Sequence, residues 1–153
     1  RCPGCFNEIA WDFGYGKTFN QETIDYILKL LKPSHIRGLT LLGGEPFEPE
    51  NQGDIVELLR QVKKQYPQKS IWAFSGYLFE KDILAGRLGP KKITQEFVSY
   101  LDVLVDGEFI YEQLDATLKW KGSANQRVID VPASFAKQEV VLHDIEEEKE
   151  DAD

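Results

Sequence analysis

The spacing of hydrophobic residues predicts a helix near the start of the chain. Across residues 24–31, apolar side chains recur three and four positions apart, as they do on one face of a helix. Lys32-Pro33 ends this run, because proline cannot continue a helix. Thr18 and Gln21 fit a capping box at the helix start, and Asn20 is an alternative cap.

Further along the chain, helical spacing alternates with short unbroken apolar runs. Helical spacing returns over residues 55–62, and less regularly over 79–84 and 94–101. Strands that alternate with helices predict an α/β protein in which helices cover a parallel sheet. The apolar runs, which are typical of buried strands, are residues 38–42, 70–74 and 103–105.

Each predicted strand ends in glycine beside a polar residue, at Gly43-Gly44-Glu45, Ser75-Gly76 and Asp106-Gly107. Ligands bind at the carboxyl ends of parallel strands, and glycine lets the backbone approach a ligand closely. These ends therefore favour a binding site, and the alternative is that they only form turns. Residues 114–131 fit either a loop at the rim of that site or an edge hairpin.

Length and composition indicate one globular domain. The chain has 153 residues, of which 42% are hydrophobic. No run approaches the roughly 18 apolar residues of a membrane helix, and no secretory signal is visible. We therefore expect a cytoplasmic protein without membrane contact. In that reducing compartment its two cysteines serve chemistry, and a disulfide between them is the alternative.

Negative charge is concentrated at the C-terminal end. The formal net charge is −8, and residues 144–153 contain seven acids and one lysine. Such a run is typical of a disordered, solubilising tail, with a docking tail as the alternative. No basic stripe is present that could attract phosphates, so we expect no nucleic-acid partner.

Both cysteines lie in the opening segment, Cys2-Pro3-Gly4-Cys5. Two thiols separated by two residues can bind one metal ion or cluster together. The same spacing occurs in structural zinc sites and in thioredoxin-like redox pairs. The redox pair fits less well, because it should precede a helix and residues 7–17 have no strong helical period.

Five segments with these features occur in one order over about residues 1–131. They are Cys2-Pro3-Gly4-Cys5-Phe6-Asn7, Leu41-Leu42-Gly43-Gly44-Glu45-Pro46, Trp72-Ala73-Phe74-Ser75-Gly76-Tyr77, Leu104-Val105-Asp106-Gly107-Glu108-Phe109 and Gly122-Ser123-Ala124-Asn125-Gln126. Together they resemble the activating proteins of anaerobic ribonucleoside-triphosphate reductase, which are radical S-adenosylmethionine enzymes. The predicted strands are too few for a closed eight-stranded barrel. We therefore expect an incomplete TIM-like barrel with outer helices as domain 1–131, followed by a C-terminal extension, residues 132–153.

The resemblance implies a Cys-x-x-x-Cys-x-x-Cys triplet that binds three irons of a 4Fe-4S cluster. Cys2 and Cys5 match the second and third cysteines, and the first would precede Arg1, so we expect the native chain to be longer. S-adenosylmethionine would bind the fourth iron, and an electron from the cluster would cleave it to methionine and a 5'-deoxyadenosyl radical. That radical would take a hydrogen atom from a glycine of the reductase catalytic subunit. A flavodoxin-like or other low-potential protein would supply the electron.

The resemblance also implies roles for particular residues. Gly43 and Gly44 would lie against the methionyl part of the cofactor, and the Glu45 carboxylate would bind its ammonium. The cofactor-binding residues expected in this way are Gly4, Cys5, Phe6, Gly43, Gly44, Glu45, Ser75 and Asp106, with Gly4 and Phe6 near the adenine and Ser75 and Asp106 near the ribose or sulfonium.

Structural alternatives stand beside these roles. Glu45 could cap the following helix with Pro46 in its first turn, Phe6 could belong to the core, and Ser75 and Asp106 could bind turn N–H groups. For the whole protein, one alternative is a non-catalytic domain that binds zinc through the two cysteines. Another is a related radical enzyme, such as a pyruvate formate-lyase activator or a deazapurine synthase.

Overall fold

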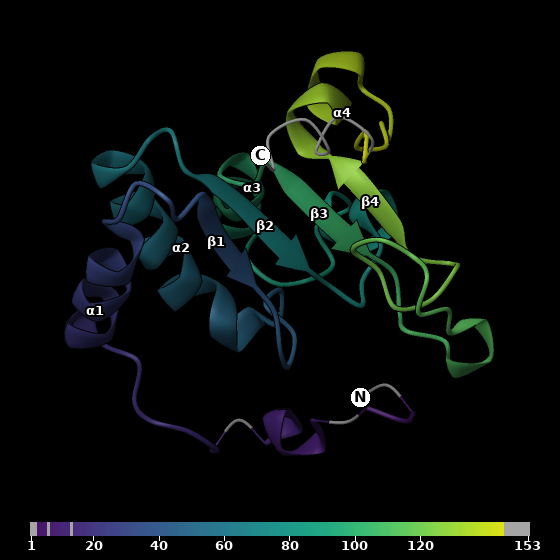
Figure 1. Cartoon of the computed structure of the whole chain (residues 1–153), viewed down its shortest axis with the longest axis horizontal. Helices are drawn as coiled ribbons and strands as arrows, with labels where there is room; N and C mark the ends of the chain where they lie inside the picture. Colours follow the sequence, from purple (N-terminus) through teal and green to yellow (C-terminus); the bar gives the residue numbers. More distant parts are fainter. Residues whose placement is uncertain (1–2, 6, 13, 146–153) are drawn as a thin grey trace.

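The computed structural model describes residues 3–5, 7–12 and 14–145, and its centre is a four-stranded sheet (Figure 1). The strands lie in the order β1-β2-β3-β4; β1, β2 and β3 are parallel, and β4 is antiparallel to β3. The α/β class and the three predicted strands are therefore confirmed, but β1 is not the buried strand expected: it lies at the sheet edge, and its residues are half-buried or exposed. Their bounds are β1 Gly38–Leu41, β2 Ser70–Phe74, β3 Val103–Asp106 and β4 Arg127–Asp130.

Three helices connect the parallel strands or precede them, as predicted from the hydrophobic spacing, and a fourth follows β4. A five-residue π-helix replaces the predicted helical stretch at 79–84. The α-helices are α1 Gln21–Leu31, α2 Pro49–Gln65, α3 Lys91–Ser99 and α4 Val131–Lys137; the shorter elements are η1 Glu8–Trp11, η2 Phe79–Ile83 and η3 Tyr111–Gln113.

The start of α1 corrects the expected capping box. Asn20, not Thr18, is the N-cap: its side-chain oxygen accepts a hydrogen bond from the Thr23 N–H, and the Thr23 hydroxyl accepts one from the Asn20 N–H. The reciprocal bonds of a capping box are thus made by asparagine and threonine, a pair that satisfies the same two backbone donors.

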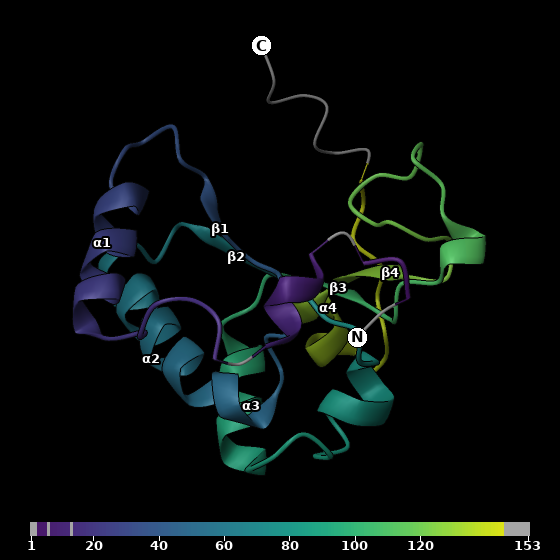
Figure 2. The ribbon, with the colours of Figure 1, turned by 90° about the horizontal axis from the view of Figure 1, so that it is seen from below.

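The two faces of the sheet differ in what covers them. Residues that alternate along the strands, such as Ile71, Ala73 and Leu104, pack with α1, α2 and α3 in the main hydrophobic core. Figure 2 shows these helices on one side of the sheet. On the opposite face, a smaller cluster contains Val103, Val105 and Val128, with Trp72, Phe74 and Ile145 packed against it.

Regular structure continues after residue 131, where the domain boundary is expected. Val131, the first residue of α4, is 1% exposed and belongs to the main core. Residues 141–143 then run antiparallel to β4, with the Asp130 N–H donating to the Val141 carbonyl and the His143 N–H donating to the Val128 carbonyl. Most of the predicted acidic tail lies outside the described residues. No helix in the described part of the chain is long and apolar enough to cross a membrane.

Candidate functional site

The loop after β1 places bare backbone at the carboxyl end of the sheet. Gly43 and Gly44 have φ angles of 84° and 50°, in the left-handed region that glycine adopts without strain. A Cβ added at Gly44 would lie 3.1 Å from the Ala10 carbonyl oxygen, so glycine lets the N-terminal segment approach closely. The alternative that Glu45 caps the following helix, with Pro46 in its first turn, is wrong: α2 begins at Pro49 and has Glu48 as its N-cap.

The Glu45 side chain joins the ends of two strands. Its Oε1 atom accepts hydrogen bonds from the Phe47 N–H at 3.0 Å and from the Ser75 hydroxyl at 2.9 Å. Its Oε2 atom accepts one from the Gly76 N–H at 2.7 Å. The Glu45 carboxylate therefore brings the end of β1 together with Ser75 and Gly76 at the end of β2.

The surroundings of Glu45 favour a positively charged ligand. Burial raises the pKa of Glu45; its hydrogen bonds from Phe47, Gly76 and Ser75 act in the opposite direction, and the nearby Glu48 raises the pKa further. All three donors are neutral groups, and none of the ion pairs among the described residues involves Glu45. A cationic group beside this carboxylate would supply the charge that its protein partners do not.

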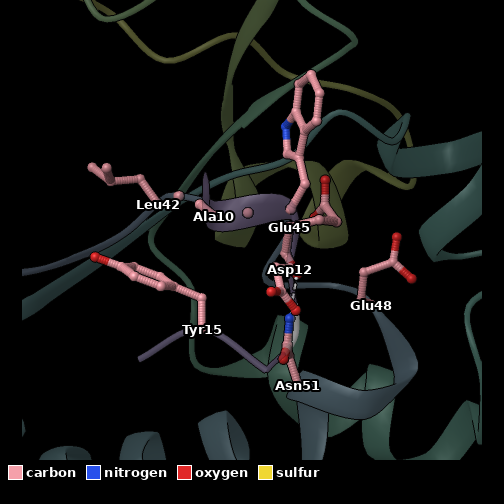
Figure 3. Close-up of a pocket in the computed structure, with 10 residues that line it drawn as sticks. Ala10, Asp12, Tyr15, Leu42, Glu45, Glu48 and Asn51 are labelled. Carbon is pink, nitrogen blue, oxygen red and sulfur yellow. Dashed lines mark hydrogen bonds between the residues drawn. The ribbon is translucent and has the colours of Figure 1, made fainter. Parts of the chain in front are cut away.

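A cavity of about 430 Å³ opens next to Glu45, between the N-terminal segment and the start of α2 (Figure 3). Its wall combines the predicted residues Gly43, Gly44 and Glu45 with polar side chains that sequence reasoning missed. No motif marks these side chains, because they come from two separate parts of the chain, the segment that follows η1 and the start of α2. They are Asp12, Tyr15, Glu48 and Asn51.

A second cavity, of about 630 Å³, adjoins the first through Gly44, Glu45 and Glu48. Tyr77 lines it and donates a hydrogen bond from its hydroxyl to Glu48 Oε1 at 2.9 Å. Burial, together with this bond and the charge of Glu48, raises the pKa of Tyr77 to about 12. Asp12 and Glu48 line the first cavity, and Asp82 and Glu108 line the second. Acidic side chains thus lie on both sides of Glu45, which again suits a cation.

The cysteine segment is described in part. Cys5 is half-buried, and its Sγ atom accepts a hydrogen bond from the Asn7 N–H at 3.4 Å. Such a bond is a known feature of thiolates that ligate iron–sulfur clusters. Cys2 and Phe6 lie outside the described residues. Within the described ranges, no three histidine, cysteine or acidic side chains lie close enough to hold a metal ion.

The remaining predicted residues, Ser75 and Asp106, are both buried. Besides donating to Glu45, the Ser75 oxygen accepts a hydrogen bond from the Tyr77 N–H at 3.1 Å. Asp106 is fully buried; it accepts a hydrogen bond from the Phe79 N–H and forms an ion pair of 2.5 Å with Arg127. Both residues thus bind turn N–H groups, as the structural alternative expected, and Arg127 is a partner that sequence reasoning missed.

Comparisons with known proteins identify relatives of this chain. Residues 1–129 match the model of the 4Fe-4S single cluster domain. An anaerobic ribonucleoside-triphosphate reductase-activating protein from Vibrio cholerae is 42% identical over 129 residues, which cover 82% of this chain and 77% of the relative. Proteins of the same name from Enterobacteria phage T4 and Escherichia coli K12 are 40% and 34% identical, covering 84% of this chain and 75% and 79% of their own lengths.

No solved structure matches the chain significantly. The matched region contains the described cysteine, the glycine turn and the strand-end carboxylate around which the two cavities are built. By both comparisons, the chain belongs to the family of anaerobic ribonucleoside-triphosphate reductase-activating proteins and carries the 4Fe-4S single cluster domain.

Proposed function

We propose that this protein activates an anaerobic ribonucleoside-triphosphate reductase by generating a glycyl radical on its catalytic subunit. The names of its relatives and its 4Fe-4S domain support this function. The observation that carries it is Glu45, a carboxylate with neutral donors only, beside a cavity with a glycine wall. S-adenosylmethionine, which has an ammonium and a sulfonium, fits that charge pattern.

In this proposal, each part of the site has its own task. Cys2 and Cys5 hold the cluster, and the Asn7 N–H bonded to Cys5 Sγ stabilises negative charge on the sulfur. When bound, the cluster supplies the electron for reductive cleavage of S-adenosylmethionine. Gly43 and Gly44 let the methionyl part of the cofactor approach the backbone, and Glu45 accepts hydrogen bonds from its ammonium.

The other predicted contacts are proposals of the same kind. Gly4 and Phe6 lie next to Cys5 in the sequence, and we place them near the adenine. Ser75 is supported as a ribose or sulfonium contact by its bond to Glu45. Asp106 ends the neighbouring strand but is bound to Arg127, so its contribution includes positioning that strand end.

We also propose that the sheet is part of an incomplete TIM-like barrel, with residues 1–131 as its domain. The order of the parallel strands and the helices on one face support this. The opposite face, with Trp72 and Phe74, borders a cavity of about 700 Å³ on the side where a barrel interior would lie. A low-potential protein such as a flavodoxin would donate the electron, in the reducing cytoplasm.

Anaerobic iron and sulfide reconstitution of the full-length protein tests this function. Electron paramagnetic resonance of the reduced sample is recorded with and without S-adenosylmethionine. We expect a 4Fe-4S signal that changes when the cofactor is added, and loss of the signal in Cys5→Ser. Glu45→Gln should keep the cluster but need about tenfold more cofactor for the same change, as expected for the loss of one charge-assisted hydrogen bond.

Glu50→Gln is the matched control, because Glu50 is an exposed carboxylate in the first turn of α2. It should leave both the cluster and the cofactor response unchanged. Transfer of the radical is then tested by adding the reductase and recording the glycyl radical signal. Uptake of zinc without formation of a cluster would contradict the proposed function and favour the structural zinc domain.

A further inference from the structure

The connection between β3 and β4 is a loop with its own hydrogen-bonded frame, residues 107–126. Gln126 ties its ends together: its Oε1 atom accepts bonds from the Gly122 N–H at 2.9 Å and the Ser123 N–H at 3.1 Å, and its Nε2 atom donates to the Gly107 carbonyl at 2.9 Å. The Gln126 side chain therefore links the start of the loop, at Gly107, to its end.

The same frame fixes the turn η3 inside the loop. The Ser123 side chain is fully buried, and its Oγ atom accepts a hydrogen bond from the Ile110 N–H at 3.2 Å. The Ala124 N–H donates to the Gln113 carbonyl at 2.9 Å. Both ends of the three-residue turn Tyr111–Gln113 are thereby held, although its side chains face solvent.

Tyr111 reaches from this turn to the cysteine segment. A Cβ added to Gly4 would lie 3.3 Å from Tyr111 Cδ2 and 3.8 Å from Cε2, so the ring packs directly against the glycine between the two cysteines. Gly4 has a φ angle of 78°, which glycine adopts without strain. The contact joins two parts of the chain that are about a hundred residues apart in the sequence.

The described residues of the cysteine segment, 3–5 and 7, lie mostly at the surface. Pro3, Gly4 and Asn7 are exposed. The hydrogen bonds described for residues 3–5 and 7 stay local: the Asn7 N–H donates to Cys5 Sγ, and the Asn7 carbonyl accepts from the Ala10 N–H. Exposed backbone with only local hydrogen bonds opens at low cost, so a contact from a rigid neighbour changes how often residues 3–5 open.

We propose that Tyr111 is a positioning residue that holds residues 3–5 in place through its ring contact with Gly4. The frame around Gln126 and Ser123 keeps the ring in place. The proposal rests on the proposed function for the identity of the metal centre, but the contact itself needs no cluster. It makes Tyr111 a determinant of access to Cys5 and of cluster retention.

The first test measures how fast Cys5 reacts in protein without a cluster. Cys2→Ser leaves Cys5 as the one thiol of the 153-residue chain, and its alkylation by iodoacetamide is followed by mass spectrometry. Tyr111→Ala should raise the rate about three- to tenfold, because the segment opens more often. Tyr111→Phe keeps the ring and should restore the original rate.

Tyr26→Ala is the matched control. Tyr26 and Tyr111 are both 62% exposed, but Tyr26 lies on α1. Its replacement should leave the alkylation rate unchanged. Because both tyrosines are largely exposed, neither variant should alter the urea unfolding midpoint. An unchanged midpoint would show that any change in the alkylation rate is local.

The second test uses the reconstituted full-length protein. Iron release to a chelator should be about three- to tenfold faster in Tyr111→Ala than in the original protein or in Tyr111→Phe, for the same reason. Unchanged alkylation and unchanged iron release in Tyr111→Ala would overturn the role of Tyr111. Faster alkylation in a protein that forms no cluster would support that role and overturn the proposed function instead.

Discussion

Glu45 couples the stability of the protein to pH through its raised pKa. The pKa in the folded state lies above the unfolded value of about 4.3, so the folded state binds a proton more readily. The resulting stability is fully present below the unfolded pKa and is lost as pH rises through the folded pKa. Glu45→Gln cannot titrate, so its unfolding free energy relative to the original protein should increase with pH over that window.

Urea unfolding at several pH values, from about pH 4 to about pH 7, measures this difference. Glutamine cannot accept the Gly76 N–H at the Oε2 position, which adds a cost that is the same at every pH. The prediction therefore concerns the slope with pH and not the offset. A difference between the two proteins that is constant with pH would contradict it.

Arg127 neutralises a buried carboxylate, and its loss should be costly. Asp106 is fully buried and pairs with Arg127, which also forms an ion pair with Glu80. Arg127→Met leaves the Asp106 charge without its cation, so we predict a loss of about 3 kcal/mol in the unfolding free energy. Urea unfolding measures it.

Two further variants isolate the cause of that loss. The double variant Asp106→Asn with Arg127→Met removes the buried charge as well and should recover part of the stability. Arg60→Met is the matched control, because Arg60 also contacts two carboxylates but is 53% exposed. It should cost much less than Arg127→Met, because water screens an exposed ion pair. Equal losses in Arg60→Met and Arg127→Met would contradict the argument.

At the residue scale, the sequence predicted the strand-end residues but not their partners. Glu45 and Ser75 were expected near one ligand, and the structure brings them within one hydrogen bond. Neither Arg127 nor Tyr77 could be predicted in the same way. Each acquires its role through an ion pair or a hydrogen bond between elements that local spacing does not connect.

At the scale of elements, a buried polar pair joins α2 to α3. Gln52 is 1% exposed; its Nε2 atom donates to the Phe47 and Leu88 carbonyls, and its Oε1 atom accepts from the Thr94 hydroxyl at 2.7 Å. Thr94→Val keeps the shape but removes that donor. We predict a loss of about 2–3 kcal/mol in unfolding free energy, because a buried acceptor is left without a partner.

Thr94→Ser is the control for this pair, since it keeps the hydroxyl and removes one methyl group. It should cost about 1 kcal/mol, the value of a single buried carbon. Because Gln52 also binds the carbonyl of Phe47, which follows the glycine turn, Thr94→Val should in addition increase hydrogen exchange at the Phe47 N–H. Equal stability of the valine and serine variants would argue against the hydrogen bond as the cause.

Elements with a clear apolar face or an unbroken apolar run could be predicted from the sequence. The helices α1 and α2 have a clear apolar face, and β1, β2 and β3 are short apolar runs, so their spacing identifies them. The antiparallel strand β4 follows the polar loop 107–126, and its pattern of two buried residues between two half-buried ones is too short to identify it. Its strand character comes from pairing with β3.

At the scale of the whole molecule, the C-terminal segment closes one end of the sheet. Val131 belongs to the main core, the Phe135 ring meets the Phe79 ring edge-on at 6.0 Å, and Ile145 packs on the opposite face against Val103 and its neighbours. The two sides of β3 and β4 are thus covered by residues beyond the region that matches the 4Fe-4S domain. The domain boundary expected at residue 131 stays a prediction, and removing these contacts by truncation tests it.

Two truncated chains place that boundary. A chain that ends at Ile145 loses six acids and one lysine from the tail, and should keep its urea unfolding midpoint because these charges repel one another. A chain that ends at Val131 loses the packing of Phe135 and Ile145, and should lose about 2–4 kcal/mol, since each partly buried apolar side chain contributes about 1–2 kcal/mol. Equal midpoints for both chains would show that residues 1–131 need no support from the extension, whereas the predicted difference would show that residues 132–145 stabilise the domain.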